Sequence, residues 1–191
     1  MIIGITGTLG AGKTTTANYL KSKGFTHYSV REFIAEEVRK RGLPINRDTL
    51  VNVGNELRAL HGSEYIVLEL GKKAQQNGSD AVIESIRAVG EAQELKKEGA
   101  YLLAVNANPK FRYERALLES SVTAPKTFDE FIAQEEREMF STDPTKQNIA
   151  AVMLRADYQI LNNGTLADLE NQIDAAILHL QTISQSSPLW S

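Results

Sequence analysis

The chain contains no cysteine among its 191 residues. This absence excludes disulfide bonds and metal sites built on thiolates, and it suits the reducing cytoplasm. No apolar run approaches the roughly 20 residues needed to cross a bilayer, so we expect no membrane partner. The apolar N-terminus is too short for a signal peptide and leads straight into a glycine-rich loop. We therefore expect a cytoplasmic protein.

Excess positive charge is also lacking. Lysine and arginine number 21 against 24 acidic residues, which gives a net charge of −3, and no basic tail or lysine-rich block is present. We therefore expect no obligate nucleic-acid partner. The composition, 42% hydrophobic and 24% charged, is ordinary for a globular protein, and the length suits one domain. Small-molecule substrates are the partners that remain.

The most informative stretch of the chain is 7–14, which reads Gly-Thr-Leu-Gly-Ala-Gly-Lys-Thr and fits the pattern G-x-x-x-x-G-K-[ST]. It follows a predicted buried strand over 1–5 and precedes a predicted helix over 15–23. This context distinguishes a phosphate-binding loop from a plain turn between a strand and a helix. The glycines let successive backbone N–H groups point at one anion, and the helix start adds partial positive charge.

Each residue of this loop then has an expected role toward ATP. Lys13 would reach the β- and γ-phosphates, and the Thr14 hydroxyl would be a ligand of Mg²⁺. We therefore predict ATP as co-substrate and Mg²⁺ as cofactor. The loop residues predicted to bind ATP are Leu9, Gly10, Ala11, Gly12, Lys13, Thr14 and Thr15.

Strand and helix signals alternate along the chain, which predicts a parallel sheet covered by helices on both faces. The predicted strands are 1–5, 25–30, 81–83, 101–105 and 158–161. The predicted helices are 15–23, 31–41, 47–60, 64–76, 91–97, 109–119, 128–139, 146–154 and a last one from the cap at Thr165 to about Leu180. Caps are expected at Asn46 and at Thr127 with Glu130.

Helices accumulate in two places, between the second and third strands and between the fourth and fifth. A phosphate-loop kinase has its acceptor-binding arm and its lid at these places. We therefore predict a single kinase-like domain over 1–181, with an arm at about 31–77, a lid at about 110–145 and a tail at 182–191.

Phosphoryl transfer needs positive charge around the moving group. Arg87 follows the third strand, where its side chain would point into the ligand crevice and hold a phosphate with two N–H groups. The alternative is a solvent-exposed arginine at a helix start. Glu84 ends the same strand and would lie near Mg²⁺ or its waters; the alternative is a carboxylate that caps the next helix.

Further charged residues are candidates in the two helical regions. Arg112 and Arg115 lie three apart on one helix face and would close over the phosphates, or else form ion pairs with Glu114, Glu119 or other surface carboxylates. Arg137 is a weaker candidate, because the neighbouring Glu135, Glu136 and Glu138 suggest a solvated face. In the arm, Arg31, Glu32 and Arg58 are candidate acceptor contacts. We interpret His27 and His61 as structural.

Three segments together resemble the nucleoside monophosphate kinase superfamily: the loop at 7–14, Glu84-Ser85-Ile86-Arg87, and Asp157-Tyr158-Gln159-Ile160-Leu161-Asn162-Asn163-Gly164. The similarity is greatest to dephospho-CoA kinase and to the adenylate-kinase-related proteins of archaea, and it covers most of 1–180. It implies that Arg87 binds the acceptor phosphate and that Arg112 and Arg115 are lid arginines. It also implies that Asn162, Asn163 and Gly164 lie beside the adenine.

Two shorter segments of the arm, Arg47-Asp48-Thr49-Leu50 and Gly54-Asn55-Glu56-Leu57-Arg58, are similar to phage-type deoxynucleoside monophosphate kinases. This similarity adds weight to Arg58 as an acceptor contact. The stretch 117–124 departs from the superfamily, because it is almost uncharged where a lid usually carries arginines.

The sequence thus predicts an α/β fold of the P-loop NTPase type, with three layers (α/β/α), a five-stranded parallel sheet, an acceptor arm and a lid. The predicted activity is Mg-ATP-dependent phosphoryl transfer to a nucleoside or deoxynucleoside monophosphate, with dephospho-CoA as the alternative acceptor. A switch ATPase or a catalytically weak nucleotide-binding protein is the second alternative. The guanine signature Asn-Lys-x-Asp is missing, which argues against a GTPase.

Overall fold

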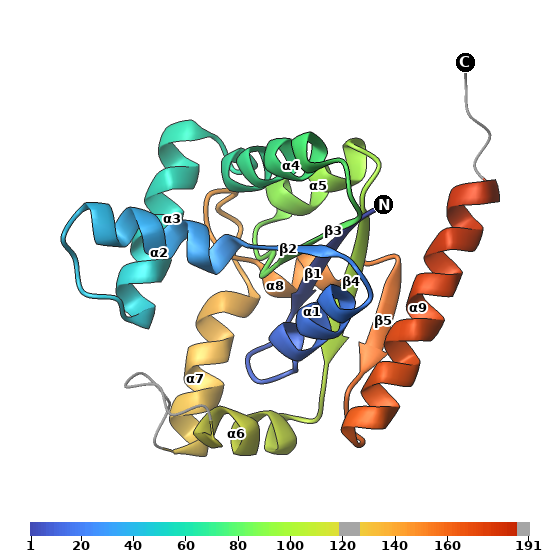
Figure 1. The fold of residues 1–191 in the computed structure, drawn as a ribbon. Helices are drawn as coiled ribbons and strands as arrows, with labels where there is room; N and C mark the ends of the chain where they lie inside the picture. The colour runs from blue at the N-terminus through green and yellow to red at the C-terminus, as the bar shows by residue number, and fades with distance from the viewer. Residues whose placement is uncertain (119–126, 187–191) are drawn as a thin grey trace.

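The computed structural model describes residues 1–118 and 127–186. The strands are β1 (Ile2–Gly7), β2 (Thr26–Ser29), β3 (Ala81–Glu84), β4 (Tyr101–Asn106) and β5 (Tyr158–Leu161). They form one sheet in the order β2-β3-β1-β4-β5, and every neighbouring pair is parallel (Figure 1). The predicted five-stranded parallel sheet is confirmed.

The helices within these residues are α1 (Lys13–Ser22), α2 (Val30–Lys40), α3 (Arg47–His61), α4 (Tyr65–Asn77), α5 (Val89–Lys97), α6 (Pro109–Leu118), α7 (Phe128–Met139), α8 (Ile149–Met153) and α9 (Leu166–Ser186). The expected caps form. Asn46 accepts a hydrogen bond of 2.8 Å from the backbone N–H of Thr49, and Thr127 forms a capping box with Glu130.

Two apolar clusters hold helices on opposite faces of the sheet. Helices α1 and α9 cover one face, where Leu20 and Ile173 pack with Ile5 of β1. Helices α4, α5 and α8 lie over the other face and share a core with α2 and α3. Figure 1 shows α6 and α7 beyond the carboxyl ends of the strands. The three-layer α/β/α architecture is therefore confirmed.

The strand register places several predicted site residues at one edge of the sheet. In the ladders, Ile5 of β1 pairs with Glu84 of β3, and Glu84 also pairs with Ser29 of β2. The loop after β1, the end of β3 and the start of α2 are therefore neighbours. In open parallel sheets, ligands bind at this carboxyl edge.

The helix boundaries differ from the expectation by three residues or more at two places. Helix α8 begins only at Ile149, because the side chain of Asn148 caps it by accepting a hydrogen bond from the N–H of Ala151. Helix α9 continues to Ser186, so part of the expected tail is helical. The remaining tail residues, with Trp190, and the segment that contains Glu119 lie outside the described residues. Across both described ranges, no helix combines the length and apolarity needed to cross a bilayer.

Candidate active site

The loop between β1 and α1 has the backbone geometry of an anion cradle. Gly10 and Gly12 have φ values of 70° and 101°, in the left-handed region that favours glycine. A Cβ atom at Gly10 would lie 2.2 Å from the backbone oxygen of Arg112. Gly12 is the N-cap of α1 and has no side chain to cap it. The first N–H groups of α1 are therefore left to face a bound anion.

The Lys13 side chain is buried beside this loop. Its Nζ donates a hydrogen bond of 2.7 Å to the backbone oxygen of Thr8. Burial, together with the positive charge of Arg87, lowers the pKa of Lys13 to about 7. A bound polyphosphate would restore the ammonium charge, because it supplies the opposite charge that this site lacks.

Thr14 and Glu84 bring two side-chain oxygens together next to the loop. The Thr14 Oγ1 donates a hydrogen bond of 2.7 Å to Glu84 Oε1, and His27 Nε2 lies 2.9 Å from Glu84 Oε2. Burial alone would raise the pKa of Glu84, but the hydrogen bonds from His27 and Thr14 hold it below its usual value.

These two side chains fit Mg²⁺. This ion is usually held by one or two protein oxygens together with substrate phosphates and water, rather than by an all-protein cage. Among the residues that the structure describes, no group of three or more His, Asp or Glu gathers as a metal site. Sequence reasoning had classed His27 as structural, since a lone histidine carries no metal-like spacing. The structure instead brings it into contact with a predicted site carboxylate.

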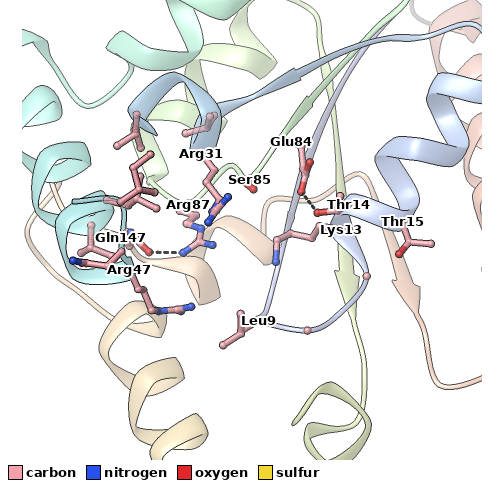
Figure 2. Close-up of a pocket in the computed structure, with 18 of the residues that line it drawn as sticks. Leu9, Lys13, Thr14, Thr15, Arg31, Arg47, Glu84, Ser85, Arg87 and Gln147 are labelled. Carbon is pink, nitrogen blue, oxygen red and sulfur yellow. Dashed lines mark hydrogen bonds between the residues drawn. The ribbon is translucent and has the colours of Figure 1, made fainter. Parts of the chain in front are cut away.

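A cavity of about 410 Å³ runs from the loop to the arm, a size that suits a small-molecule substrate (Figure 2). Its lining combines residues of the loop, α2, α3 and the end of β3. The lining residues are Leu9, Gly10, Gly12, Lys13, Thr14, Thr15, Val30, Arg31, Ile34, Ile45, Asn46, Arg47, Leu50, Val51, Arg58, Glu84, Ser85, Arg87 and Gln147.

Four arginines line this cavity: Arg31 from α2, Arg47 and Arg58 from α3, and Arg87 after β3. Figure 2 shows Arg31, Arg47 and Arg87 on the side of the cavity that faces Lys13 and Leu9. The structure therefore gathers three arginine candidates, Arg31, Arg58 and Arg87, and adds Arg47. Opposite the loop, the cavity is lined by positive charge.

Arg87 has acidic and polar partners in this structure. Its Nη1 donates hydrogen bonds of 2.7 Å to Glu138 Oε2 of α7 and 3.2 Å to Gln147 Oε1. Arg47 contacts the other oxygen of Glu138. Burial lowers the pKa of Arg87, although the Glu138 carboxylate opposes this effect. One carboxylate thus joins two of the cavity arginines.

Arg58 is buried and held by Glu91 of α5. Its Nε and Nη2 donate hydrogen bonds of 2.9 and 2.7 Å to Glu91 Oε1. The other Glu91 oxygen accepts hydrogen bonds from the backbone N–H groups of Arg87 and Ala88. Within the described parts of the chain, Arg58 Nη1 has no hydrogen-bond partner. Glu91 therefore fixes two of the three guanidinium nitrogens of Arg58, and the third is buried without a partner in the described residues.

The two predicted lid arginines do not line the cavity. Arg112 is buried against the loop, where its Nη1 donates a hydrogen bond of 3.2 Å to the backbone oxygen of Leu9, and it forms an ion pair with Glu135 of α7. Arg115 donates a hydrogen bond of 3.0 Å to the backbone oxygen of Asn162. In this conformation both guanidinium groups support the loop region.

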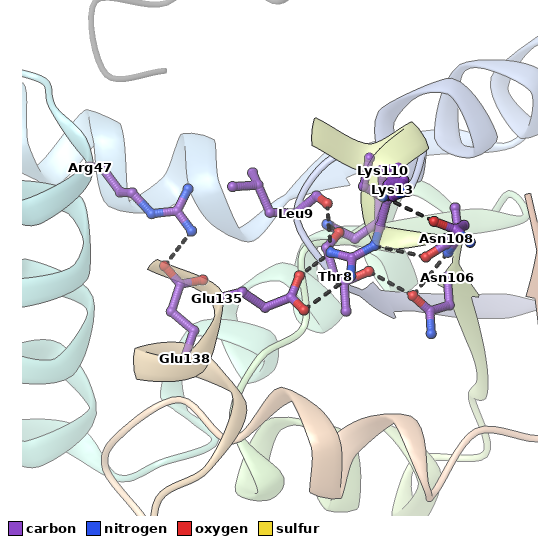
Figure 3. Close-up of polar contacts among 11 residues, drawn as sticks. Thr8, Leu9, Lys13, Arg47, Asn106, Asn108, Lys110, Glu135 and Glu138 are labelled. Atoms are coloured by element: carbon purple, nitrogen blue, oxygen red, sulfur yellow. Dashed lines mark hydrogen bonds and ion pairs between the residues drawn. The ribbon is translucent and has the colours of Figure 1, made fainter. Parts of the chain in front are cut away.

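Helix α7 carries two inward carboxylates. Glu135 reaches toward the loop and Glu138 toward Arg47 (Figure 3). The expectation that the acidic run around Arg137 forms a solvated face is therefore wrong at these two positions. They lie three residues apart and hence share one face of the helix, which packs toward the site.

Five other predicted residues lie outside the cavity lining, and one of them is Ala11 of the loop, which is fully buried. Asn162 is buried, and its Nδ2 donates a hydrogen bond of 2.9 Å to the backbone oxygen of Ala11. Asn163 accepts one from the backbone N–H of Asn108, and Gly164 follows it. These contacts fasten the segment after β5 to the rest of the site. Glu32 is exposed and contacts Arg39 instead of the cavity.

Comparisons with known proteins agree with this geometry. Residues 3–137 match the family described as AAA domain. The UPF0200 protein of Pyrococcus horikoshii is 30% identical, and the match covers 93% of this chain and 96% of that one.

The structure of shikimate kinase from Acinetobacter baumannii in complex with shikimate is similar, with a TM-score of 0.59 and 15% identity, and 97% and 95% of the two chains are covered. The gluconokinase from Sinorhizobium meliloti gives a TM-score of 0.58 and 14% identity, with 97% of each chain covered. The fold is that of the P-loop kinases.

Proposed function

The chain belongs to the AAA domain family and to the UPF0200 proteins, and on this premise we propose that it is a Mg-ATP-dependent phosphotransferase for a small nucleotide-like acceptor. The observation that carries the proposal is the continuous cavity, which has a phosphate cradle at one end and four arginines at the other. A nucleoside or deoxynucleoside monophosphate is the first choice of acceptor, and dephospho-CoA is the alternative.

At the donor end, the loop amides and Lys13 would bind the ATP phosphates, and Thr14 with Glu84 would hold Mg²⁺. The metal would supply positive charge that stabilises the negative charge of the phosphates. The acceptor oxygen would attack the γ-phosphorus in line, while the bond to the bridging oxygen breaks and ADP leaves. Lys13 would stabilise the charge on the transferring group.

At the acceptor end, Arg87, Arg31 and Arg58 would bind the acceptor, with 31–77 as the arm and 110–145 as the lid. The guanidinium fork suits phosphate oxygens because it offers two parallel N–H groups. Gathering these side chains beside Lys13 supports transfer between two bound anionic substrates, because each substrate then has its own source of positive charge.

An acceptor-independent ATPase is the second candidate. The observation that favours it is the position of Arg112 and Arg115, both of which are engaged outside the cavity. A lid that never delivers these side chains to the phosphates would leave the reaction slow and open to water.

A screen of ADP release separates these candidates. The purified protein is incubated with Mg-ATP and, in turn, each ribo- and deoxynucleoside monophosphate, dephospho-CoA, shikimate and gluconate. We expect one nucleotide-like acceptor to raise ADP release at least tenfold. Lys13→Ala should abolish this activity, and Lys21→Ala, an exposed position on the same helix, should not. Equal ADP release with and without every acceptor would favour the ATPase, and no binding of Mg-ATP would refute both candidates.

A further inference from the structure

We propose that Glu138 is an internal competitor for the acceptor's anionic group, and that it selects a phosphoryl dianion over a carboxylate. This inference deepens the proposed function and rests on it for the premise that the cavity takes an acceptor. It assigns a specificity-determining role to a residue of α7 that lies outside the arm.

The contacts of Glu138 are those of a bound oxyanion. Its two carboxylate oxygens each take one arginine, Arg47 on one side and Arg87 on the other. Its side chain is only 8% exposed, against 19% for Arg87 and 20% for Arg47. A carboxylate supplied by the protein therefore already satisfies two of the arginines on which an acceptor anion would depend.

The cavity still holds positive charge after this pairing. Four guanidinium groups line it, against three carboxylates in or beside it, Glu84, Glu91 and Glu138. Arg31 lines the cavity and has no hydrogen bond or ion pair to any described residue. Arg58 Nη1 is buried without a partner in the described ranges. The N–H groups of Arg31 and of Arg58 Nη1 therefore have no protein acceptor among the described residues.

Glu91 and Glu138 differ in how easily a ligand could displace them from their arginine partners. Glu91 is fully buried, and its second oxygen caps the backbone N–H groups of Arg87 and Ala88. Within the described ranges, the Glu138 carboxylate has hydrogen bonds to Arg47 and Arg87, and none to a backbone N–H group; it lies in the last turn of α7. An incoming anion would therefore displace Glu138 and leave Glu91 in place.

Because a ligand must compete with Glu138 for Arg47 and Arg87, it needs enough negative charge to displace this carboxylate. Glu138 is tethered beside Arg47 and Arg87, so its effective concentration is on the order of millimolar or more. A ligand carboxylate offers the same two oxygens and must also lose its free translation and rotation. A phosphoryl group carries nearly two charges and three acceptor oxygens. It can satisfy Arg47 and Arg87 and also bond to Arg31 or Arg58. We therefore infer that the acceptor carries a phosphomonoester, and that monocarboxylate acids are rejected.

The test measures binding of two minimal probes, methyl phosphate and acetate, by NMR titration. The loop is first saturated with magnesium and a non-hydrolysable ATP analogue, so that the probes report on the acceptor end. We expect the wild type to bind methyl phosphate at least tenfold more tightly than acetate. Glu138→Gln should tighten methyl phosphate binding at least tenfold and bring acetate into the measurable range. Glu136→Gln, an exposed change of equal charge on the same helix, should alter neither value more than twofold.

Additional variants address folding and site assignment. Adding Arg87→Ala to Glu138→Gln should remove the gain, because the freed arginine is its source. Should Glu138→Gln fold poorly, Glu138→Asp keeps the charge on a shorter side chain and should give an intermediate gain. In either variant, methyl phosphate should raise the melting temperature more than it does in the wild type.

The proposal is overturned if neither variant tightens probe binding, if the gain persists without Arg87, or if the wild type binds acetate as tightly as methyl phosphate. A failure of the proposed function is recognised separately, because the ATP analogue then does not bind at the first step. In that case the same titrations are run on variants that also carry Lys13→Ala, which weakens binding of the probes at the loop. A gain from Glu138→Gln would still be expected there, and its absence would refute the competitor role.

Discussion

Thr14 and Glu84 lie 70 positions apart in the chain, yet the Thr14 hydroxyl donates a hydrogen bond of 2.7 Å to the Glu84 carboxylate. The register of the sheet accounts for this contact. Ile5 of β1 pairs with Glu84 of β3, so the loop that follows β1 folds back beside the end of β3. The two oxygens that would share Mg²⁺ are thus positioned by backbone ladders rather than by flexible segments.

Glu84→Gln should weaken this metal site. The amide keeps the shape of the side chain but loses its charge, so it binds a divalent cation poorly. We expect the apparent affinity for Mg²⁺ to fall by about 10- to 100-fold, the range found when partners of metal sites are removed. The measurement is a magnesium titration of analogue binding. Glu98→Gln, on an exposed position after α5, serves as the control. An unchanged magnesium midpoint would show that Glu84 acts only as a partner of Thr14 and His27.

Nucleotide affinity should depend on pH through Lys13. The pKa of Lys13 is about 7 in the free protein, against an ordinary value of 10.5, and bound phosphates would raise it again. A group whose pKa rises on binding favours the complex most below its free-state pKa. Affinity should therefore be constant below about pH 7 and fall above it, with a proton taken up per complex. Calorimetry at pH 8 in two buffers of different ionisation enthalpy measures this proton. Lys13→Met should bind weakly and show no uptake at any pH.

Ser85→Gly should stabilise the protein. Ser85 has a φ of 75° and is the non-glycine residue in the described ranges with a positive φ. A left-handed backbone costs a non-glycine residue about 1–2 kcal/mol, and glycine adds an entropic cost of about 0.5–1 kcal/mol in the unfolded state. We expect a net gain of about 0.5–1 kcal/mol in the free energy of unfolding, measured with urea. Ser85→Ala keeps the strain and should give no gain. Because Ser85 lines the cavity, lower activity in both variants would assign its hydroxyl to the acceptor.

Gly10→Ala should both destabilise the protein and abolish nucleotide binding. The added Cβ would meet the backbone oxygen of Arg112 at 2.2 Å, and backbone cannot move aside as a side chain can. The φ of 70° adds strain. Gly24→Ala is the matched control, because Gly24 also has a positive φ, of 99°, with nothing within 4 Å of the added atom. Gly24→Ala should cost about 1–2 kcal/mol in the free energy of unfolding. Gly10→Ala should cost more, and equal losses would contradict the close contact.

Local sequence signals predicted most of the architecture. The loop motif, the strand at 101–105 and the cap at Asn46 depend on neighbours within a few residues, and the structure has them where expected. The end of the last helix was missed, because the helical signal weakens gradually and no stop residue marks it. Helix α9 reaches Ser186.

The site was harder to predict where it depends on charge pairs between distant elements. The carboxylates Glu91 and Glu138 were missed because an acidic residue on a helix usually faces water. Arg112 was expected at the phosphates, but it instead contacts Leu9 and Glu135. No local pattern reveals such pairs, since the partners lie on helices whose relative placement only the folded chain defines.

The ion pair of Arg58 with Glu91 also affects how easily each helix beside the cavity could be displaced. That pair is buried, and Glu91 also accepts a hydrogen bond from the backbone N–H of Arg87. Separating α3 from the sheet would leave a buried charge unpaired, at a cost of about 3–5 kcal/mol. The link between α7 and the arm is the ion pair of Glu138 with Arg47, whose side chain is 20% exposed, so this pair costs less to separate than the fully buried pair of Arg58 and Glu91. Of the two walls, α7 is therefore the one whose displacement from the cavity would cost less free energy.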